Sequence, residues 1–223
     1  YTKQLVEKEE KEEMMMLKNK WFKFSLVLFL LPLVCILVTY NKLPAQVATH
    51  FDFHGTPDGY MNKFLGLYGV WGFMLVLHIF CAFMTFKDPK KSNIPDIGLR
   101  IVLMICPLIC LMVTLLIITY SLGYRFDMTF IMNIVIGFIF IILGNYLPKI
   151  KRNYTIGIRI SWALNSDENW SRTHRFSGYV FVLSGMLYII FSMLGYMFIG
   201  LGIILISILL CSGYSYSLYR KGI

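Results

Sequence analysis

The chain has 223 residues, of which 57% are hydrophobic, with a mean hydropathy of +0.66 and a formal net charge of +9. Apolar residues make up just under half of a soluble domain, so this composition excludes an ordinary soluble protein. The positive charge is concentrated in the connections between apolar segments, so we interpret it as a signal of membrane topology and expect no direct nucleic-acid binding. All five cysteines lie in apolar segments, and we expect them to be small hydrophobic side chains without disulfides.

Six apolar segments are long enough, or nearly so, to cross about 30 Å of hydrocarbon as helices. They cover residues 21–40, 64–86, 99–120, 128–147, 176–193 and 196–216. Backbone polar groups must be hydrogen-bonded within the protein in lipid, so the segments are helices. The sequence therefore predicts an all-α integral membrane protein, with a bundle of six transmembrane helices forming one domain over residues 21–223.

Residues 1–20 form a charged lead in which glutamates and lysines are interleaved, and Glu7 and Lys11 have helical i,i+4 spacing. We interpret this lead as a cytoplasmic N-terminal extension, either helical or frayed, with no binding role.

The distribution of basic residues predicts the orientation. All but three of the 21 Lys and Arg residues lie in the N-terminal tail through Lys23, in the second-to-third connection through Arg100, in the fourth connection or at the C-terminal end. The exceptions are Lys42, Lys63 and Arg125. The positive-inside rule then predicts that both termini and the loop 148–175 are cytoplasmic, and that the loop 41–63 is extracellular.

The extracellular loop reads LPAQVATHFDFHGTPDGYMNK over residues 43–63. Apolar and polar residues alternate along 47–54, and a period of two predicts an extended, strand-like segment. The sequence Thr-Pro-Asp-Gly at 56–59 predicts a turn after it. Phe51 and Phe53 share one face, so we expect the outer helix ends or the membrane interface to cover them.

Two histidines in this loop raise the question of a metal site. His50 and His54 have Asp52 and Asp58 nearby. On an extended chain the two imidazoles are about 13 Å apart, too far to chelate one ion. We therefore expect no metal and favour hydrogen bonds within a compact loop. A membrane-embedded, metal-dependent enzyme that uses these four residues is the alternative.

The second apolar segment holds His78, the exception among spans that otherwise carry almost no ionisable side chains. Such a group is a candidate functional residue. Without a buried charged partner, we favour a neutral imidazole that is hydrogen-bonded to another helix. The scarcity of ionisable groups argues against an ion-coupled transporter, and we find no catalytic motif. We therefore expect no enzyme, with a small-molecule transporter as a further alternative.

The longest polar interruption reads GNYLPKIKRNYTIGIRISWALNSDENWSRTHRFSG over residues 144–178. A simple connector needs only a few residues, so this segment is either a folded element or a contact surface. Pro148 ends the fourth helix, and residues 154–162 are rich in β-forming side chains.

The end of the fourth connection carries a helix-start signal. Asn165 and Ser166 are N-cap residues, and the two acidic residues after them suit the positive end of a helix dipole. A helix is therefore predicted to begin near Asp167 and to continue into the fifth span. Small residues in two columns on this helix predict close packing against another helix: Ser171, Gly178, Gly185 and Ser192, with Ser177 and Ser184 beside them.

Two motifs together resemble one family. The pattern LPxxVxxHFxxxGxPDGYxxK is similar to a small N-terminal module of unknown function found in SdpI-type membrane proteins. The pattern GNYLPKIKRNYTIGIRxxWxLxSxxNWxxTHRFSG is similar to the signature of the SdpI family itself, with Ala163 where the family commonly has threonine. The resemblance covers nearly the whole chain from Trp21 onward.

The SdpI family includes bacterial immunity proteins that protect a cell against a secreted, membrane-active peptide toxin. A toxin-engaged immunity protein can also hold a small transcriptional repressor at the membrane. The resemblance thus implies a multi-pass protein of the bacterial plasma membrane, without a cofactor, whose partners are the bilayer, a secreted peptide toxin on the outer face and a cytoplasmic repressor.

The resemblance also implies two sets of candidate site residues, none of them catalytic or metal-binding. We expect the toxin to contact the extracellular loop at Pro44, His50, Phe51, Phe53, Gly55, Pro57, Asp58, Tyr60 and Lys63. The cytoplasmic set either receives a partner or ties the loop to the helix ends, and both interpretations stay open: Asn145, Pro148, Asn153, Gly157, Arg159, Trp162, Trp170, His174 and Arg175.

Overall fold

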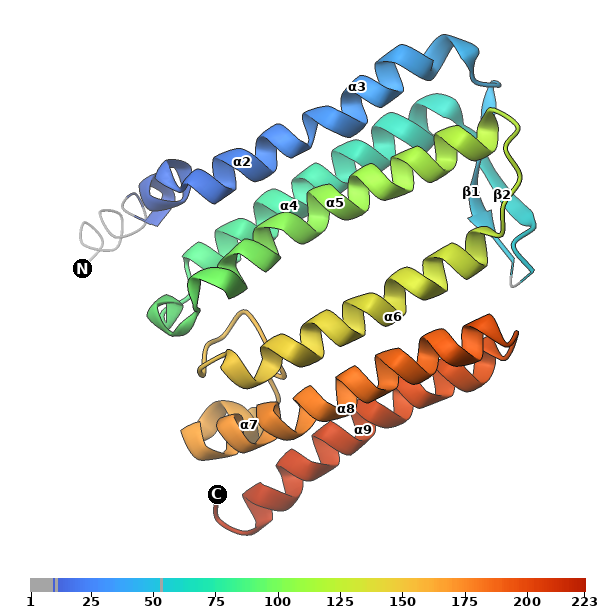
Figure 1. Cartoon of the computed structure of the whole chain (residues 1–223). Helices are drawn as coiled ribbons and strands as arrows, with labels where there is room; N and C mark the ends of the chain where they lie inside the picture. The colour runs from blue at the N-terminus through green and yellow to red at the C-terminus, as the bar shows by residue number, and fades with distance from the viewer. Residues whose placement is uncertain (1–9, 11, 53) are drawn as a thin grey trace. The chain divides into compact units, whose positions relative to one another are not determined.

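The computed structural model describes residues 10, 12–52 and 54–223, so the expectations about Phe53 and the Glu7–Lys11 pair lie outside the described residues. The elements follow the chain in a simple order (Figure 1): α2 Lys20–Leu28, α3 Leu30–Thr39, β1 Gln46–Phe51, β2 Pro57–Asn62, α4 Val70–Phe86, α5 Asp96–Ser121, α6 Met128–Tyr146, α7 Ser161–Asn165, α8 Asp167–Met193 and α9 Met197–Arg220.

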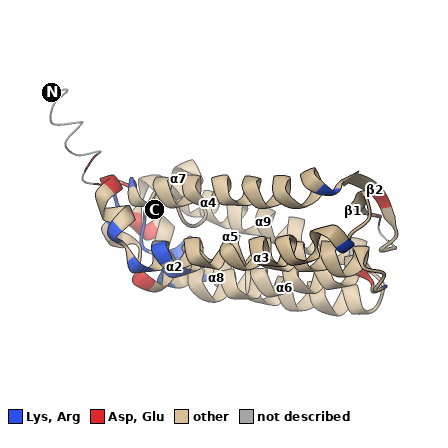
Figure 2. Cartoon of the chain, turned by 90° about the horizontal axis from the view of Figure 1, so that it is seen from above, with Lys and Arg blue, Asp and Glu red and all other residues tan. Residues whose placement is uncertain are grey.

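Among the described residues, six helical stretches are long and apolar enough to cross a membrane. They are Lys20–Lys42, Leu65–Phe86, Asp96–Ser121, Met128–Lys149, Asp167–Met193 and Phe198–Arg220, and each matches a predicted span. Lys and Arg lie toward the ends of these stretches (Figure 2). The six predicted membrane-spanning helices are therefore confirmed. The described residues are not all-α, because β1 and β2 form a two-stranded sheet. The packing of the six helices into one bundle and the cytoplasmic placement of both termini stay predictions.

The residue contacts group into two compact units, which we describe separately. Unit 1 runs to Lys87 and includes Leu99–Thr129, and unit 2 holds Asp88–Gly98 and Phe130–Ile223. The assignment of residues 21–223 to one domain, with residues 1–20 as an extension, stays a prediction.

In unit 1, α2 is joined to α4 through a buried polar contact. His78 Nε2 lies 2.8 Å from Ser25 Oγ, and both side chains are fully buried. The serine hydroxyl donates to the Phe22 carbonyl at 2.7 Å, so the imidazole is the donor in the His78–Ser25 bond. The expected hydrogen bond from His78 to another helix is confirmed, whereas the neutral state of the imidazole stays a prediction.

In unit 2, small residues allow α6 and α8 to pack closely. A Cβ on Gly185 would lie 2.6 Å from the Gly137 carbonyl oxygen, and a Cβ on Gly144 would lie 2.7 Å from Val182 N. The close approach at Gly178 and Gly185 confirms the predicted packing at these two positions, whereas Ser171 is exposed. The partner glycines on α6 are also seven residues apart, a pattern that we did not single out in the sequence.

A buried amide connects α8 to α9. Asn169 Oδ1 accepts from Ser215 Oγ at 2.6 Å and from Thr173 Oγ1 at 3.0 Å, and Asn169 Nδ2 donates to the Ser215 carbonyl at 3.0 Å. A satisfied network of this kind fixes the register of two helices where an apolar surface alone would let them slide. All five cysteines are free, as expected.

Candidate functional site

The loop after α3 folds as an antiparallel β-hairpin of β1 and β2. The extended segment predicted over 47–54 is confirmed as far as Phe51, where β1 ends. The turn predicted at 56–59 is wrong, because Pro57–Asn62 is strand β2. The turn lies between Asp52 and Thr56, where Asp52 Oδ1 accepts the N–H groups of His54 at 2.9 Å and Thr56 at 2.8 Å. Gly55, with φ +74°, takes the left-handed conformation that this turn requires.

One face of the hairpin is packed on unit 1. Val47 is buried in an apolar cluster with Leu67 and Ile117, and the Phe51 ring meets Tyr120 edge-on with 4.9 Å between centroids. Thr129 Oγ1 donates to the Asp52 carbonyl at 2.8 Å, which fastens the turn to the start of α6. The expected cover for Phe51 is therefore a helix end.

The candidate hairpin residues divide by exposure. Pro44, His50, Asp58 and Tyr60 are exposed, whereas Phe51, Gly55, Pro57 and Lys63 are half-buried. The Lys63 ammonium donates to the Tyr40 carbonyl at 3.1 Å and lies 4.4 Å from the centroid of the Tyr40 ring. Lys63 thus ties the base of the hairpin to the end of α3.

The two hairpin histidines have different surroundings. His50 Nδ1 is hydrogen-bonded to Asp58 Oδ1 across the strands, so the expected bond within the loop is confirmed for His50. His54 is exposed at the turn. Among the described residues, no group of three or more His, Cys, Asp or Glu side chains is placed to hold a metal ion.

A shallow, open hollow of 410 Å³ lies beside the hairpin turn. Its polar lining includes Arg125 and Asp127 from the α5–α6 connection, as well as His54 and Thr56. The Arg125 guanidinium donates to the Tyr120 carbonyl at 3.0 Å and stacks on the Tyr120 ring at 4.5 Å. Our site prediction missed Arg125 and Asp127, although Arg125 is one of only three basic residues predicted on the outer face.

In unit 2, the segment between α6 and α8 has an irregular backbone followed by the short helix α7. Its β-forming residues at 154–162 make no strand, because side chains satisfy the backbone instead. Asn153 is fully buried; its Oδ1 accepts the N–H groups of Thr155 and Ile156, and its Nδ2 donates to the Lys151 and Ile156 carbonyls. A single amide thus organises the first half of the loop.

The second half of the loop closes on the start of α8, which begins at Asp167 with Ser166 as its N-cap, as predicted. His174 and Trp170 are buried and stacked, with ring centroids 4.0 Å apart. His174 Nε2 accepts the Ile158 N–H at 3.0 Å, so Nδ1 carries the proton that is donated to the Trp170 carbonyl at 2.9 Å. Gly157, with φ +117°, packs so closely that a Cβ there would lie 2.4 Å from His174 Nε2.

The connection between α4 and α5 also supports the loop. The buried Asp88 carboxylate accepts the Tyr154 N–H at 2.8 Å and the Thr155 hydroxyl at 2.6 Å. Asn93 Nδ2 donates to the Arg152 carbonyl at 2.7 Å. Sequence reasoning missed Asp88 and Asn93; the available signal was one acidic residue among the lysines of this connection.

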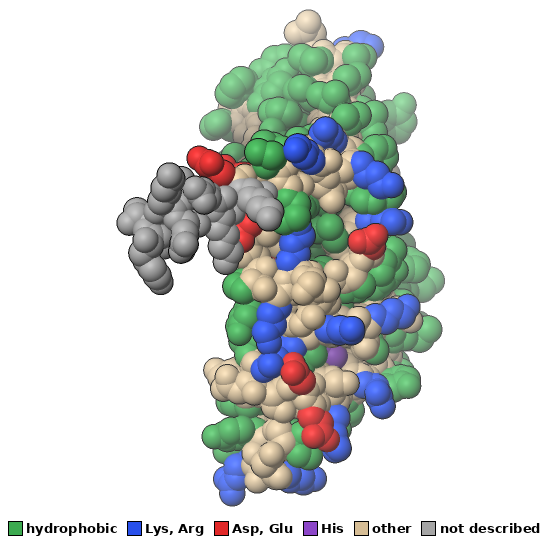
Figure 3. All heavy atoms as spheres, turned by 90° about the vertical axis from the view of Figure 1, so that its left-hand side faces the viewer, with side chains coloured by type: hydrophobic (Ala, Val, Ile, Leu, Met, Phe, Trp, Pro, Cys, Tyr) green, Lys and Arg blue, Asp and Glu red, His purple; other side chains and the backbone are tan. Residues whose placement is uncertain are grey.

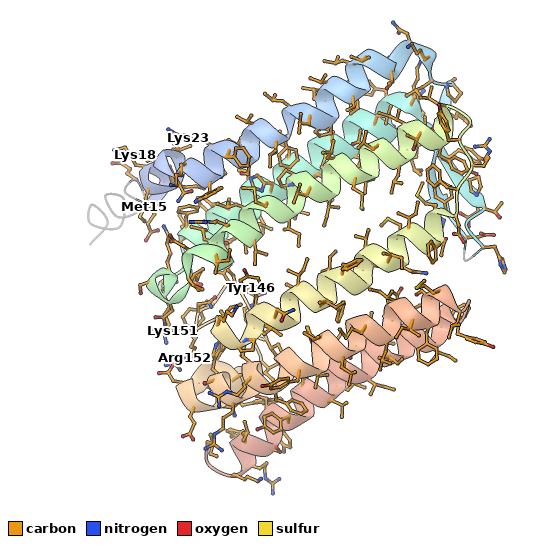
Figure 4. All side chains as sticks on the ribbon, viewed as in Figure 1. Met15, Lys18, Lys23, Tyr146, Lys151 and Arg152 are labelled. Carbon is orange, nitrogen blue, oxygen red and sulfur yellow. The ribbon has the colours of Figure 1, made fainter. Side chains whose placement is uncertain are left out.

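The remaining candidate loop residues lie nearer the surface. Asn145, Pro148, Arg159 and Arg175 are exposed, and Trp162 is half-buried against the rings of Tyr216 and Tyr219. Helix α6 ends at Tyr146, and the basic residues Lys151 and Arg152 follow it in the loop (Figure 4). Lys151 is also exposed. The loop thus joins a hydrogen-bonded core to a basic surface.

Two family models match the chain. The model of the SdpI/YfhL protein family matches residues 149–215, which cover the loop, α8 and most of α9. The model of a domain of unknown function, DUF1648, matches residues 27–75, which include the hairpin. No curated protein and no solved structure matches the chain. The resemblance stated from the two motifs is therefore confirmed.

Proposed function

We propose, from the membership of this chain in the SdpI/YfhL protein family, that it is an immunity protein of the bacterial plasma membrane that gives resistance to a secreted, membrane-active peptide. The family match over residues 149–215 is the observation that carries this proposal. In this role the protein binds a peptide and performs no catalysis.

The hairpin is the surface that we propose for peptide contact. Tyr60 is 57% exposed, and His50 and Asp58 are exposed beside it. The hollow at the turn adds the charged side chains of Arg125 and Asp127 to this surface. Half-buried Phe51 and Pro57 support this surface from below, so their contribution to binding is indirect.

A resistance assay tests the proposal. The protein is expressed in a bacterial strain that is sensitive to a membrane-active peptide, and survival is titrated against a panel of such peptides. We expect at least one peptide for which the protein raises the tolerated concentration, and we expect Tyr60→Ala to lower it again. Unchanged survival against every peptide would reject the proposal.

Tyr196→Ala is the matched control for Tyr60→Ala. Tyr196 is 58% exposed and lies in the connection between α8 and α9, away from the hairpin sequence. Membrane levels of both variants are measured by immunoblot. If both variants reach the membrane at wild-type levels and lose resistance equally, the hairpin is not the surface that contacts the peptide.

We further propose that the basic surface of the 148–175 loop receives a cytoplasmic repressor. Arg159 is exposed, and its Nη1 donates to the Tyr154 carbonyl at 2.8 Å, which leaves its other donors free to face a partner. Lys151 is exposed on the same loop. A fluorescent repressor is expected to move to the membrane when the peptide is added, and Arg159→Ala is expected to abolish that movement without lowering the protein level.

A further inference from the structure

The charged residues of unit 2 lie at one end only. They occupy residues 88–98, 149–175 and 220–221, and the α8–α9 connection carries none. Two cations are paired with acids, Arg152 with Asp167 and Arg172 with Glu168, and the carboxylate of Asp88 is occupied by the loop. The end of unit 2 that holds α7 therefore keeps a large excess of positive charge. Figure 3 faces the left-hand side of Figure 1, where α7 lies, and shows many Lys and Arg side chains on that side.

Helix α8 has two different faces. One face is buried and carries Trp170, His174 and the small residues that meet α6. The opposite face is exposed at intervals of three and four residues, from Arg172 and Arg175 through Tyr179, Leu183, Met186 and Ile190 to Met193. In a membrane-spanning helix, such an exposed apolar stripe is covered by lipid chains.

Arg175 stands where this stripe meets the basic end. It is the last charged residue before the apolar part of α8, and it is one turn before Tyr179, which is 75% exposed. Arg175 is exposed, and no ion pair or hydrogen bond of its side chain occurs with any described residue. Arg172, one turn earlier, is instead held by Glu168 at 2.6 Å.

We propose that Arg175, Tyr179 and Leu183 form a binding site for an anionic phospholipid. The Arg175 guanidinium binds the lipid phosphate through two parallel N–H donors, a geometry that suits phosphate oxygens. The Tyr179 phenol lies at the level of the headgroup, as tyrosines do at membrane interfaces, and an acyl chain follows Leu183 and Met186. The excess positive charge at this end selects an anionic headgroup over a zwitterionic one.

The site is tested on the purified full-length chain in neutral detergent, independently of any toxin. Phosphatidylglycerol and phosphatidylcholine are titrated separately, and bound lipid is counted by native mass spectrometry. We expect wild-type protein to bind phosphatidylglycerol about fivefold more tightly than phosphatidylcholine, the effect of roughly one basic residue at an anionic surface. Arg175→Gln is expected to remove this preference, and Arg175→Lys to restore part of it.

Arg172→Gln is the matched control, because it removes the same charge one turn away on the same exposed stripe. We expect it to retain the preference. If Arg172→Gln and Arg175→Gln lose the preference for phosphatidylglycerol equally, the lipid is attracted by the overall positive charge and not by a site at Arg175, and the proposal is overturned. Competition by inorganic phosphate at the same concentration as the lipid would overturn the assignment to a phospholipid, as would equal binding of both lipids by the wild type.

Discussion

The hairpin of unit 1 and the 148–175 loop of unit 2 are both polar segments between spans, and both lie within family matches, but they place their motif residues differently. In the loop, the side chains of Asn153, Trp170 and His174 are buried and hydrogen-bonded to the backbone of residues 150–158. In the hairpin, His50 and Tyr60 are exposed. The buried motif residues of the loop therefore stabilise the fold, whereas the exposed motif residues of the hairpin are available to contact a partner. Burial of the side chain distinguishes the two groups.

The largest expected effect is in the loop, at Gly157. Gly157→Ala is expected to destabilise the protein by about 2–4 kcal/mol, because the residue has a positive φ and its new Cβ would strike His174. The midpoint of thermal unfolding in detergent measures the effect. Gly213→Ala is the control, since a Cβ there meets nothing within 4 Å, and an equal loss in both variants would contradict the packed loop core.

The next effect compares two asparagines of the same motif. Asn153→Ala is expected to cost about 1–3 kcal/mol, because it leaves buried backbone groups of the loop without partners. Asn145→Ala removes one exposed bond to the Ile141 carbonyl and is expected to cost less than about 0.5 kcal/mol. Both are measured by unfolding in detergent; equal costs would show that burial does not separate these residues.

A smaller effect is expected at Gly55, a strained position of the hairpin. Gly55→Ala should destabilise by about 1 kcal/mol, since φ is +74° but the nearest atom to a new Cβ is Asp127 Oδ1 at 2.8 Å, which is the end of a side chain and not backbone. Comparing the loss of stability in Gly55→Ala with that in Gly157→Ala measures how much more tightly the loop is packed than the hairpin. A loss at Gly55 as large as that at Gly157 would show that the hairpin turn is as tightly built as the loop.

The smallest effect is expected for the exposed pair on the hairpin. His50→Ala breaks its bond to Asp58, and a pair at the surface contributes about 0–1 kcal/mol. We therefore expect nearly unchanged unfolding together with a measurable loss of peptide resistance. A clear loss of stability, in the range expected for Asn153→Ala, would assign His50 to the fold and weaken the proposed contact surface.

The sequence alone determined the spans and several local features, because these depend on short-range physics. Hydrophobic length identified the six membrane helices, and the Ser166 cap located the start of α8. Period-two alternation identified β1. The absence of charged partners within the spans indicated that His78 is hydrogen-bonded to another helix.

The tertiary structure decided what depends on distant residues. The hairpin turn lies at Asp52–Thr56 and not at the predicted position, which included Pro57 and Gly59. Pro57 is paired with Phe51 in the sheet, and the Asp52 side chain accepts the Thr56 N–H in the turn. The β-forming run at 154–162 stayed irregular because Asp88 and His174, far away in sequence, took up its backbone donors. Local propensity describes which conformations a segment favours, but the partners of its buried polar groups decide which one it adopts.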